Sequence, residues 1–271
     1  MMKNCLEIIR PLVGERKPVK AALFDFDGTI SILRQGWEEI MEPLMIEMIN
    51  GKAPIDQELV NKIRDFIDES TGIQTIYQMY WLVDQVEKYE RNPEVHDAWW
   101  YKDEYNRRLL EVVRRRIDML ISGELKPEDC RIKGSLEFLE ALKEKGVDIY
   151  VASGTDDVDV QREVELVGIK QFVKHVEGAP HRRADCSKEA VIKNLIENED
   201  LHGSELVVIG DGKVEIGLGV EAGAITIGAA TDEINRSDMN EVKRKKLIRA
   251  GANAIVGDFL KYEDILHWLS I

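Results

Sequence analysis

Short apolar runs alternate with amphipathic segments along most of the chain. The runs are VKAALFDFD (19–27), VDIYVASG (147–154), FVKHVEGA (172–179), ELVVIGDG (205–212), AITIGAA (224–230) and ANAIVGD (252–258). Most of them are continuously apolar, which is typical of strands that are covered on both faces of a sheet. Amphipathic patterns predict helices over 134–146, 157–168, 187–199 and 233–251. Repeated strand–helix–strand units imply right-handed crossovers, so the sequence predicts an α/β fold with a parallel sheet between two layers of helices.

The segment 31–126 has a different pattern. It contains long amphipathic stretches such as DEYNRRLLEVVRRRIDML and no clear strand. A connection this long between two strands of one sheet indicates an inserted unit. We therefore expect an α/β core formed by 1–30 and 127–271 and a helical insertion at 31–126. The alternative is a single long helical layer over the sheet.

Composition narrows the classes of function. The chain has 271 residues, 44% of them hydrophobic, and a net charge of -14, which disfavours nucleic acid or an anionic membrane as the partner. The cysteines, Cys5, Cys130 and Cys186, show neither zinc-site spacing nor a disulfide framework. The N-terminal segment lacks a signal peptide's apolar region, and no stretch has the length of a membrane span. These features predict a soluble, cytoplasmic protein.

Two aspartates stand two positions apart where the first core strand ends, in AALFDFDGTI. Residues i and i+2 of a strand point to the same side, so Asp25 and Asp27 are expected to project together at the edge where parallel sheets bind ligands. Two adjacent carboxylates ionise together only beside a cation; otherwise one of them keeps a proton. Gly28 allows a sharp backbone turn, and Thr29 is expected to form a local hydrogen bond. The pair is a candidate for nucleophilic, metal-binding or proton-transfer chemistry, with an ordinary Asp-Gly turn as the alternative.

Other strand ends and one helix start carry further polar groups. Ser153 and Gly154 end a strand and can donate hydrogen bonds to an anion, or they can simply cap the next helix. Lys188 stands in the first turn of a predicted helix, where a cation is unfavourable unless it has a partner. Asp211 follows another strand, with Glu215 four residues later, and such hard oxygen ligands suit Mg²⁺. A dinucleotide-binding loop in GDGKVEIGLGVEAG is disfavoured because its glycines do not match the required spacing.

Taken together and in this order, these motifs resemble the haloacid dehalogenase superfamily of phosphotransferases, with its Rossmann-like core. DFDGT matches the first motif, Ser153 the second, Lys188 the third, and Asp211 with Glu215 the fourth. The resemblance covers nearly the whole chain, and 31–126 then corresponds to the helical cap of the family. Two departures stand out: Glu215 replaces the usual aspartate, and no proline follows the lysine.

The resemblance implies a role for each of these residues. Asp25 would be the nucleophile that forms an aspartyl-phosphate, and Asp27 would protonate the leaving oxygen and then activate water. Mg²⁺ would be bound by Asp25, the Asp27 carbonyl and Asp211, with Glu215 also in the metal set. Ser153, Gly154 and Lys188 would hold the phosphoryl oxygens. Alternative cations for the lysine role are Arg182, Arg183, Lys170 and Lys174.

The resemblance also narrows the reaction. Its dehalogenase and phosphonatase branches lack an acid at the position of Asp27, so a phosphoester substrate is favoured. In the insertion, the loop-like stretch ESTGIQTIYQMYW makes Thr71, Gly72, Gln74 and Thr75 candidates for substrate contact, with a plain capped helix start as the alternative. The absence of Lys and Arg there suggests a neutral leaving group such as a sugar or polyol. We expect a Mg²⁺-dependent phosphatase of a small metabolite; the alternatives are a phosphomutase and a non-catalytic phosphometabolite-binding protein.

Overall fold

The protein has one central β-sheet in a computed structural model, which describes residues 6–12, 17–184, 187–198, 201 and 203–271. Within these residues the strand order is β1-β7-β6-β5-β2-β3-β4, and every neighbouring pair is parallel except β1 and β7. The strands are β1 Leu6–Ile8, β2 Ala21–Phe24, β3 Asp148–Asp156, β4 His175–Ala179, β5 Leu206–Gly210, β6 Ile225–Ala229 and β7 Ala254–Val256. The predicted α/β fold with a parallel sheet is confirmed.

The sequence did not predict β1, a three-residue edge strand that pairs antiparallel with β7. The first core strand is also shorter than predicted, because β2 ends at Phe24 and the backbone turns at Gly28 with a φ of 75°. The alternation of side chains along a strand therefore does not fix the direction of Asp27 relative to Asp25.

Helices occupy the connections between the strands. The α-helices are α1 Glu38–Asn50, α2 Gln57–Glu69, α3 Thr75–Tyr89, α4 Ala98–Ser122, α5 Ser135–Glu144, α6 Asp157–Leu166, α7 Ser187–Asn198, α8 Lys213–Glu221, α9 Glu241–Ala250 and α10 Tyr262–Leu269. Short 3₁₀ helices span Pro127–Cys130, Lys170–Phe172 and Gly203–Glu205. Helices α5, α6 and α7 match the predicted segments closely, whereas α8 and α10 were not predicted.

The predicted helix 233–251 is wrong in its first half. Helix α9 begins only at Glu241, where the Asn240 side chain accepts hydrogen bonds from the backbone N–H groups of Val242 and Lys243. Before it, the Asp232 carboxylate accepts from the backbone N–H of Ile234 at 3.0 Å and holds a turn. Local side-chain bonds of this kind compete with helix formation.

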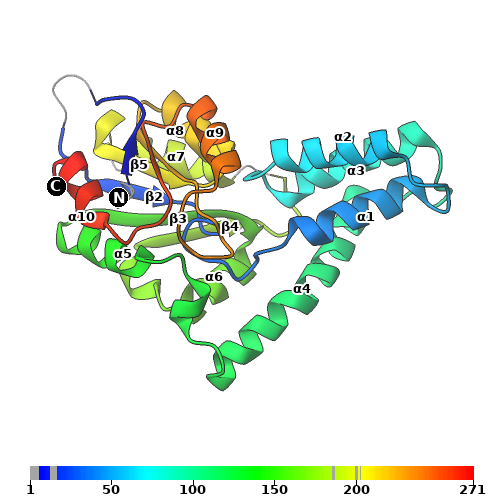
Figure 1. The fold of residues 1–271 in the computed structure, drawn as a ribbon, viewed down its shortest axis with the longest axis horizontal. Helices are drawn as coiled ribbons and strands as arrows, with labels where there is room; N and C mark the ends of the chain where they lie inside the picture. Colours follow the sequence, from blue (N-terminus) through cyan, green and yellow to red (C-terminus); the bar gives the residue numbers. More distant parts are fainter. Residues whose placement is uncertain (1–5, 13–16, 185–186, 199–200, 202) are drawn as a thin grey trace.

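The alternation of side chains along the strands builds a core on each face of the sheet. Ala22 and Phe24 of β2 belong to an apolar cluster with residues of α5, α6 and α10. Ala21 and Leu23 belong to a cluster with residues of α7. Figure 1 shows α5, α6 and α10 on one side of the sheet and α7, α8 and α9 on the other. Asp25 continues the Ala21–Leu23 series and therefore lies on the α7 side.

Helices α1 to α4, called the helical bundle below, have an apolar core of their own, centred on residues such as Met45, Leu82 and Tyr101. Figure 1 shows the bundle projecting beside the sheet rather than covering one of its faces. The domain boundaries at 30/31 and 126/127 stay a prediction. Among the described residues, no helix is long and apolar enough to cross a membrane.

Candidate active site

A cavity lies where the carboxyl ends of β2, β3 and β5 face the helical bundle. Its lining from the α/β side includes Asp25, Asp27, Gly28, Gly154, Lys188 and Asp211. Its lining from the bundle and the segment leading to it includes Arg34, Thr71, Gly72, Thr75, Lys102 and Asn106. The structure thus brings most of the predicted site residues to one place, from segments nearly 190 positions apart in the sequence.

Asp25 forms a buried ion pair with Lys188. The Lys188 Nζ lies 2.7 Å from Asp25 Oδ1 and 3.1 Å from Glu215 Oε2, and all three residues are less than a tenth exposed. Glu215 Oε1 in turn accepts a hydrogen bond from the Gly212 backbone N–H at 2.6 Å. Burial raises the pKa of Asp25 well above its ordinary value, and the Lys188 charge opposes that rise. The ion pair holds the Lys188 ammonium beside Asp25, the carboxylate that is predicted from the sequence to be the nucleophile.

Asp27 lies in a different environment, although it is only two residues away. Its Oδ2 accepts hydrogen bonds from Ser153 Oγ at 3.1 Å and Thr155 Oγ1 at 2.9 Å. Its Oδ1 is buried and has no hydrogen-bond partner among the described residues. Burial raises the pKa of the Asp27 carboxyl, opposed first by the Arg34 charge and then by the two hydroxyls. A carboxyl with a raised pKa and one bare oxygen is suited to carry a proton.

Asp211 is paired with a lysine that the sequence analysis did not single out. Lys243 Nζ, from the first turn of α9, lies 2.6 Å from Asp211 Oδ2 and 2.5 Å from Glu233 Oε1. Gly28 provides the space for this group, because a Cβ atom at Gly28 would lie 2.3 Å from Asp211 Oδ2. A lysine near a helix N-terminus opposes the helix dipole and favours a partner, but the predicted helix 233–251 placed Lys243 in its interior, so this signal was hidden.

The charges around this site favour a divalent cation. Carboxylate oxygens of Asp25, Asp211 and Glu215 lie within 4.8 Å of one another. With Glu233 they make four carboxylates facing two ammonium groups, which leaves two negative charges when Asp27 keeps its proton. Hard oxygen donors and a deficit of two positive charges both fit Mg²⁺.

Each oxygen of Glu215 already accepts one hydrogen bond, from Lys188 Nζ or from the Gly212 backbone N–H, and keeps a second lone pair. Its observed contacts orient Lys188 and the loop at Gly212. The prediction that Glu215 is a metal ligand stays a prediction.

The loop between α2 and α3 lies directly over the reaction centre. A Cβ atom at Gly72 would stand 2.8 Å from Glu215 Oε2 and 3.6 Å from Lys188 Nζ, and the Gly72 φ of 92° favours glycine. Thr71, Gly72 and Thr75 line the cavity, whereas Gln74 is buried at the start of α3 and is not among the lining residues described. The loop that the sequence singled out therefore borders the cavity through its other three residues, and its contact with a substrate stays a prediction.

Ser153 is only 1% exposed and, unlike its neighbours Gly154 and Thr155, is not among the described lining residues. Its Oγ donates to Asp27 and accepts from the Thr155 backbone N–H at 3.0 Å. It therefore supports Asp27 here, and its predicted contact with the phosphoryl group stays a prediction.

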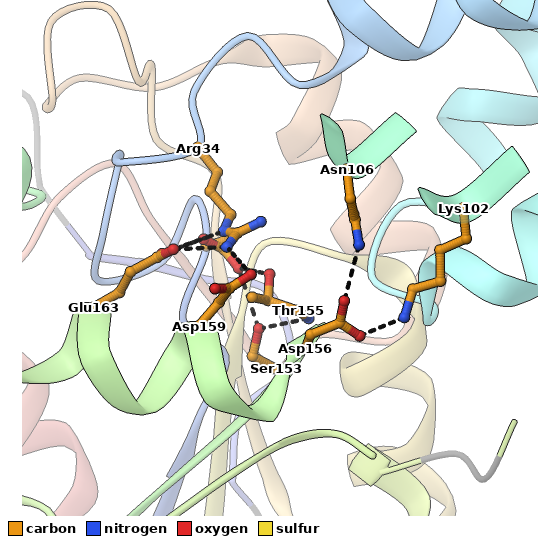
Figure 2. Close-up of polar contacts among 9 residues, drawn as sticks. Arg34, Lys102, Asn106, Ser153, Thr155, Asp156, Asp159 and Glu163 are labelled. Carbon is orange, nitrogen blue, oxygen red and sulfur yellow. Dashed lines mark hydrogen bonds and ion pairs between the residues drawn. The ribbon is translucent and has the colours of Figure 1, made fainter. Parts of the chain in front are cut away.

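Two further groups of charged residues surround the cavity and were missed by the sequence analysis. Figure 2 shows the Arg34 guanidinium against Glu163 and Asp159 of α6, and Asp156 between Lys102 and Asn106 of α4. The segments that meet in each group are at least 50 residues apart in the sequence, so no local pattern links them.

The alternative cations for the lysine role lie elsewhere. Lys170 Nζ donates to Gln161 at 3.0 Å, Lys174 pairs with Asp148 at 2.8 Å, and Arg182 pairs with Asp103 at 2.6 Å. None of these, nor Arg183, is among the described lining residues. Within the described residues, Lys188 is the candidate that contacts Asp25.

Two smaller expectations concern Thr29 and the cysteines. The Thr29 hydroxyl has no hydrogen-bond partner among the described residues, so its expected local bond is wrong. Cys130 is a buried free thiol, while Cys5 and Cys186 lie outside the described residues.

Solved structures with the same architecture come from several bacteria. A predicted phosphoglycolate phosphatase from Haemophilus somnus is 16% identical, with a TM-score of 0.62 over 93% of this chain and 99% of that one. A beta-phosphoglucomutase from Clostridium difficile is 16% identical, with a TM-score of 0.58 over 93% and 97%. A phosphonoacetaldehyde hydrolase-like protein from Oleispira antarctica is 13% identical, with a TM-score of 0.63 over 97% and 96%. At these identities the similarity establishes the fold.

Family membership rests on the sequence itself. A search of curated protein sequences finds no match. The family model of the haloacid dehalogenase-like hydrolases, however, matches residues 19–223, which include the first aspartate pair, Ser153, Lys188 and Asp211. With three quarters of the chain matched and these side chains gathered around one cavity, the protein belongs to the haloacid dehalogenase-like hydrolases.

Proposed function

We propose that the protein is a Mg²⁺-dependent phosphatase that hydrolyses the phosphoester of a small metabolite through an aspartyl-phosphate. The observation that carries the proposal is the separation of two neighbouring carboxylates into different environments. Asp25 contacts an ammonium group at 2.7 Å, while Asp27 contacts hydroxyl groups and has a bare oxygen. When their surroundings push the pKa values of two neighbouring carboxyls apart, one can act as the nucleophile while the other transfers protons.

In the first step, an Asp25 oxygen attacks phosphorus and the bond from phosphorus to the leaving oxygen breaks. Lys188, which is buried beside Asp25, offsets the negative charge of the phosphoryl group as the two anions approach. Glu215 keeps the lysine in place through its second carboxylate contact. Charge neutralisation and positioning supply most of the catalysis in phosphoryl transfer.

Asp27 moves the proton in both steps. Burial raises the pKa of the Asp27 carboxyl and so favours the protonated form, which can give its proton to the leaving oxygen. It then has a free carboxylate that accepts a proton from the water that attacks the aspartyl-phosphate. Ser153 and Thr155 fix the carboxyl by binding one oxygen, while the other oxygen accepts no hydrogen bond from the described residues.

Mg²⁺ would be held by the carboxylates of Asp25 and Asp211 and, by analogy with the family, by the Asp27 carbonyl. When bound it neutralises the phosphoryl charge and supplies the two positive charges that the site lacks. The cation would share Asp211 with Lys243, whose contact to Glu233 gives the lysine a second partner.

The helical bundle would select the leaving group, since Thr71, Gly72 and Thr75 face the cavity from the bundle. A phosphoester is favoured over a phosphonate because Asp27 supplies the acid that a leaving alcohol needs. A cytoplasmic location, expected from the sequence, is part of the same proposal.

The proposal is tested by phosphate release from a panel of metabolite phosphates, with Mg²⁺ and with excess chelator. We expect release that requires Mg²⁺ and that is lost in Asp25→Asn. Asp103→Asn, which removes an exposed carboxylate outside the cavity, is the matched control and should retain activity. Absence of metal-dependent release across the panel would refute a phosphatase. Isomerised product without free phosphate would identify a phosphomutase, the activity named for one of the similar structures.

A further inference from the structure

Two polar residues of α4 converge on one carboxylate of the α/β core. Lys102 and Asn106 are four residues apart and so lie on one face of the helix. Lys102 pairs with Asp156 Oδ1, and Asn106 Nδ2 donates to Asp156 Oδ2 at 2.9 Å, so each carboxylate oxygen has one partner from α4 (Figure 2). All three residues line the cavity.

The direction of the Asp156 side chain is not what its backbone position favours. Asp156 is the N-cap residue of α6, where an aspartate normally accepts a hydrogen bond from the first turn of its own helix. Here the side chain makes no such bond and extends toward α4 instead. The contact with α4 therefore replaces a stabilising helix cap.

Asp156 neutralises the one cation that the bundle helices place in the cavity. Lys102 is 6% exposed, and its ammonium is also 5.5 Å from the Trp99 ring. The other cation outside the reaction centre, Arg34, is held by Glu163 at 2.6 Å and by Asp159 at 3.2 Å. Each described cation that lines the cavity thus has a carboxylate partner, Lys188 included.

The remaining side chains that line the cavity on the bundle side are uncharged: Trp37, Ile73 and Leu109 are apolar, and Gln35, Ser70, Thr71, Thr75, Gln78 and Tyr105 are polar. Hydroxyl groups of a ligand can exchange hydrogen bonds with such side chains and with Asp156, Lys102 and Asn106. A second anionic group would instead meet the Asp156 carboxylate and find its counter-ions already paired. Bringing like charges together in such a site costs several kcal/mol, on the order of a hundredfold or more in affinity.

We propose that Asp156, held by Lys102 and Asn106, selects the leaving group: the substrate is the monophosphate of a neutral, polyhydroxylated compound, and substrates with a second anionic group are rejected. This inference rests on the proposed phosphatase activity. It assigns Asp156 as the residue that determines specificity, because removing its charge turns Lys102 into an available cation.

The test compares kcat/KM for two pairs of probes of similar size. α-Glycerol phosphate and a hexose monophosphate have neutral leaving groups, whereas phosphoglycolate and a hexose bisphosphate have anionic ones. We expect the wild-type protein to prefer the neutral members by at least about tenfold. Asp156→Asn keeps the shape but frees the Lys102 charge, so the ratio of anionic to neutral kcat/KM should rise by about tenfold or more.

Lys102→Met has the opposite effect, because it leaves the Asp156 carboxylate without its cation, and the same ratio should fall. The double variant removes both charges, and its ratio should lie between those of the single variants. These opposed directions distinguish a role in specificity from simple destabilisation, which lowers both values of kcat/KM together.

A wild-type preference for anionic leaving groups, or an unchanged ratio in both single variants, overturns the inference while the phosphatase stands. Absence of release from every probe, with Mg²⁺ present, overturns the proposed function and this inference with it. If Asp156→Asn does not fold, Lys102→Met decides the question by the direction of its ratio.

Discussion

Replacing Arg34 with Met tests the buried ion pair beside the cavity. The guanidinium contacts Glu163 Oε1 at 2.6 Å and 3.1 Å, and the two residues are 8% and 1% exposed. Removing one partner of such a pair leaves an uncompensated buried charge, which costs about 3–5 kcal/mol of unfolding free energy. This loss of unfolding free energy has an upper limit, because Glu163 can become protonated and then no longer carries an unpaired charge.

Because Glu163 can be protonated, the unfolding free energy lost in Arg34→Met depends on pH. Burial, opposed by Arg34, raises the pKa of Glu163 from 4.5 to about 7. The folded state therefore binds more protons than the unfolded state between these values, and stability falls as the pH rises through that window. Without Arg34 the pKa of Glu163 rises further, so the variant continues to lose stability above pH 7. Each pH unit there adds about 1.4 kcal/mol to the difference between variant and wild type, until the loss reaches its limit.

The assay is urea unfolding of both proteins at about pH 6 and about pH 8.5, followed by helix content. We expect the destabilisation to be larger at the higher pH by at least about 1.4 kcal/mol. In the double variant Arg34→Met/Glu163→Gln the buried Glu163 carboxylate is gone, so the extra loss at high pH should shrink to the part that comes from Asp27, whose pKa Arg34 also lowers. An equal loss at both pH values, or a double variant that keeps the full pH dependence, would refute the assignment of Glu163 as a buried charge that depends on Arg34.

Three substitutions test the metal-binding side of the cavity. Gly28→Ala places a Cβ atom 2.3 Å from Asp211 Oδ2 in a left-handed backbone conformation, so it should displace that carboxylate and weaken Mn²⁺ binding by about tenfold or more in a calorimetric titration. Unchanged affinity would show that the Asp211 position is irrelevant to metal binding. Lys243→Met removes a positive charge 2.6 Å from Asp211 and should tighten Mn²⁺ binding by about tenfold, whereas Glu233→Gln should weaken it because the lysine then has Asp211 as its one carboxylate. Shifts of the same sign in these last two variants would contradict the competition between Lys243 and the metal.

The sequence by itself determined the architecture and the centre of the candidate site. Continuous apolar runs separated by amphipathic helices were sufficient for the parallel sheet, because both signals are local and repeat along the chain. The spacing of Asp25 and Asp27, and the order of Ser153, Lys188 and Asp211 after them, pointed to one edge of the sheet. Parallel strands all end at that edge, so no detailed packing was needed to bring these residues together.

Other parts of the fold carried weak or misleading local signals. Strand β1 has three residues and pairs at an edge, which is too short for a periodic pattern. Helix α8, KVEIGLGVE, contains two glycines and has no clear polar face, so no helix was predicted there. The segment before α9 has the apolar spacing of a helix but is held in turns by the side chain of Asp232.

Only the tertiary structure decided which partner each charged group has. Lys243 reaches Asp211 from a helix 32 positions later, Lys102 reaches Asp156 across 54 positions, and Arg34 reaches Glu163 across 129. These pairs form because helices α4, α6 and α9 pack at particular places around the strand ends, and packing of that kind leaves no mark on the periodicity of any single segment. The sequence placed the two aspartates at the end of a strand. The packing separated their environments, so that Asp25 meets a lysine and Asp27 meets two hydroxyl groups.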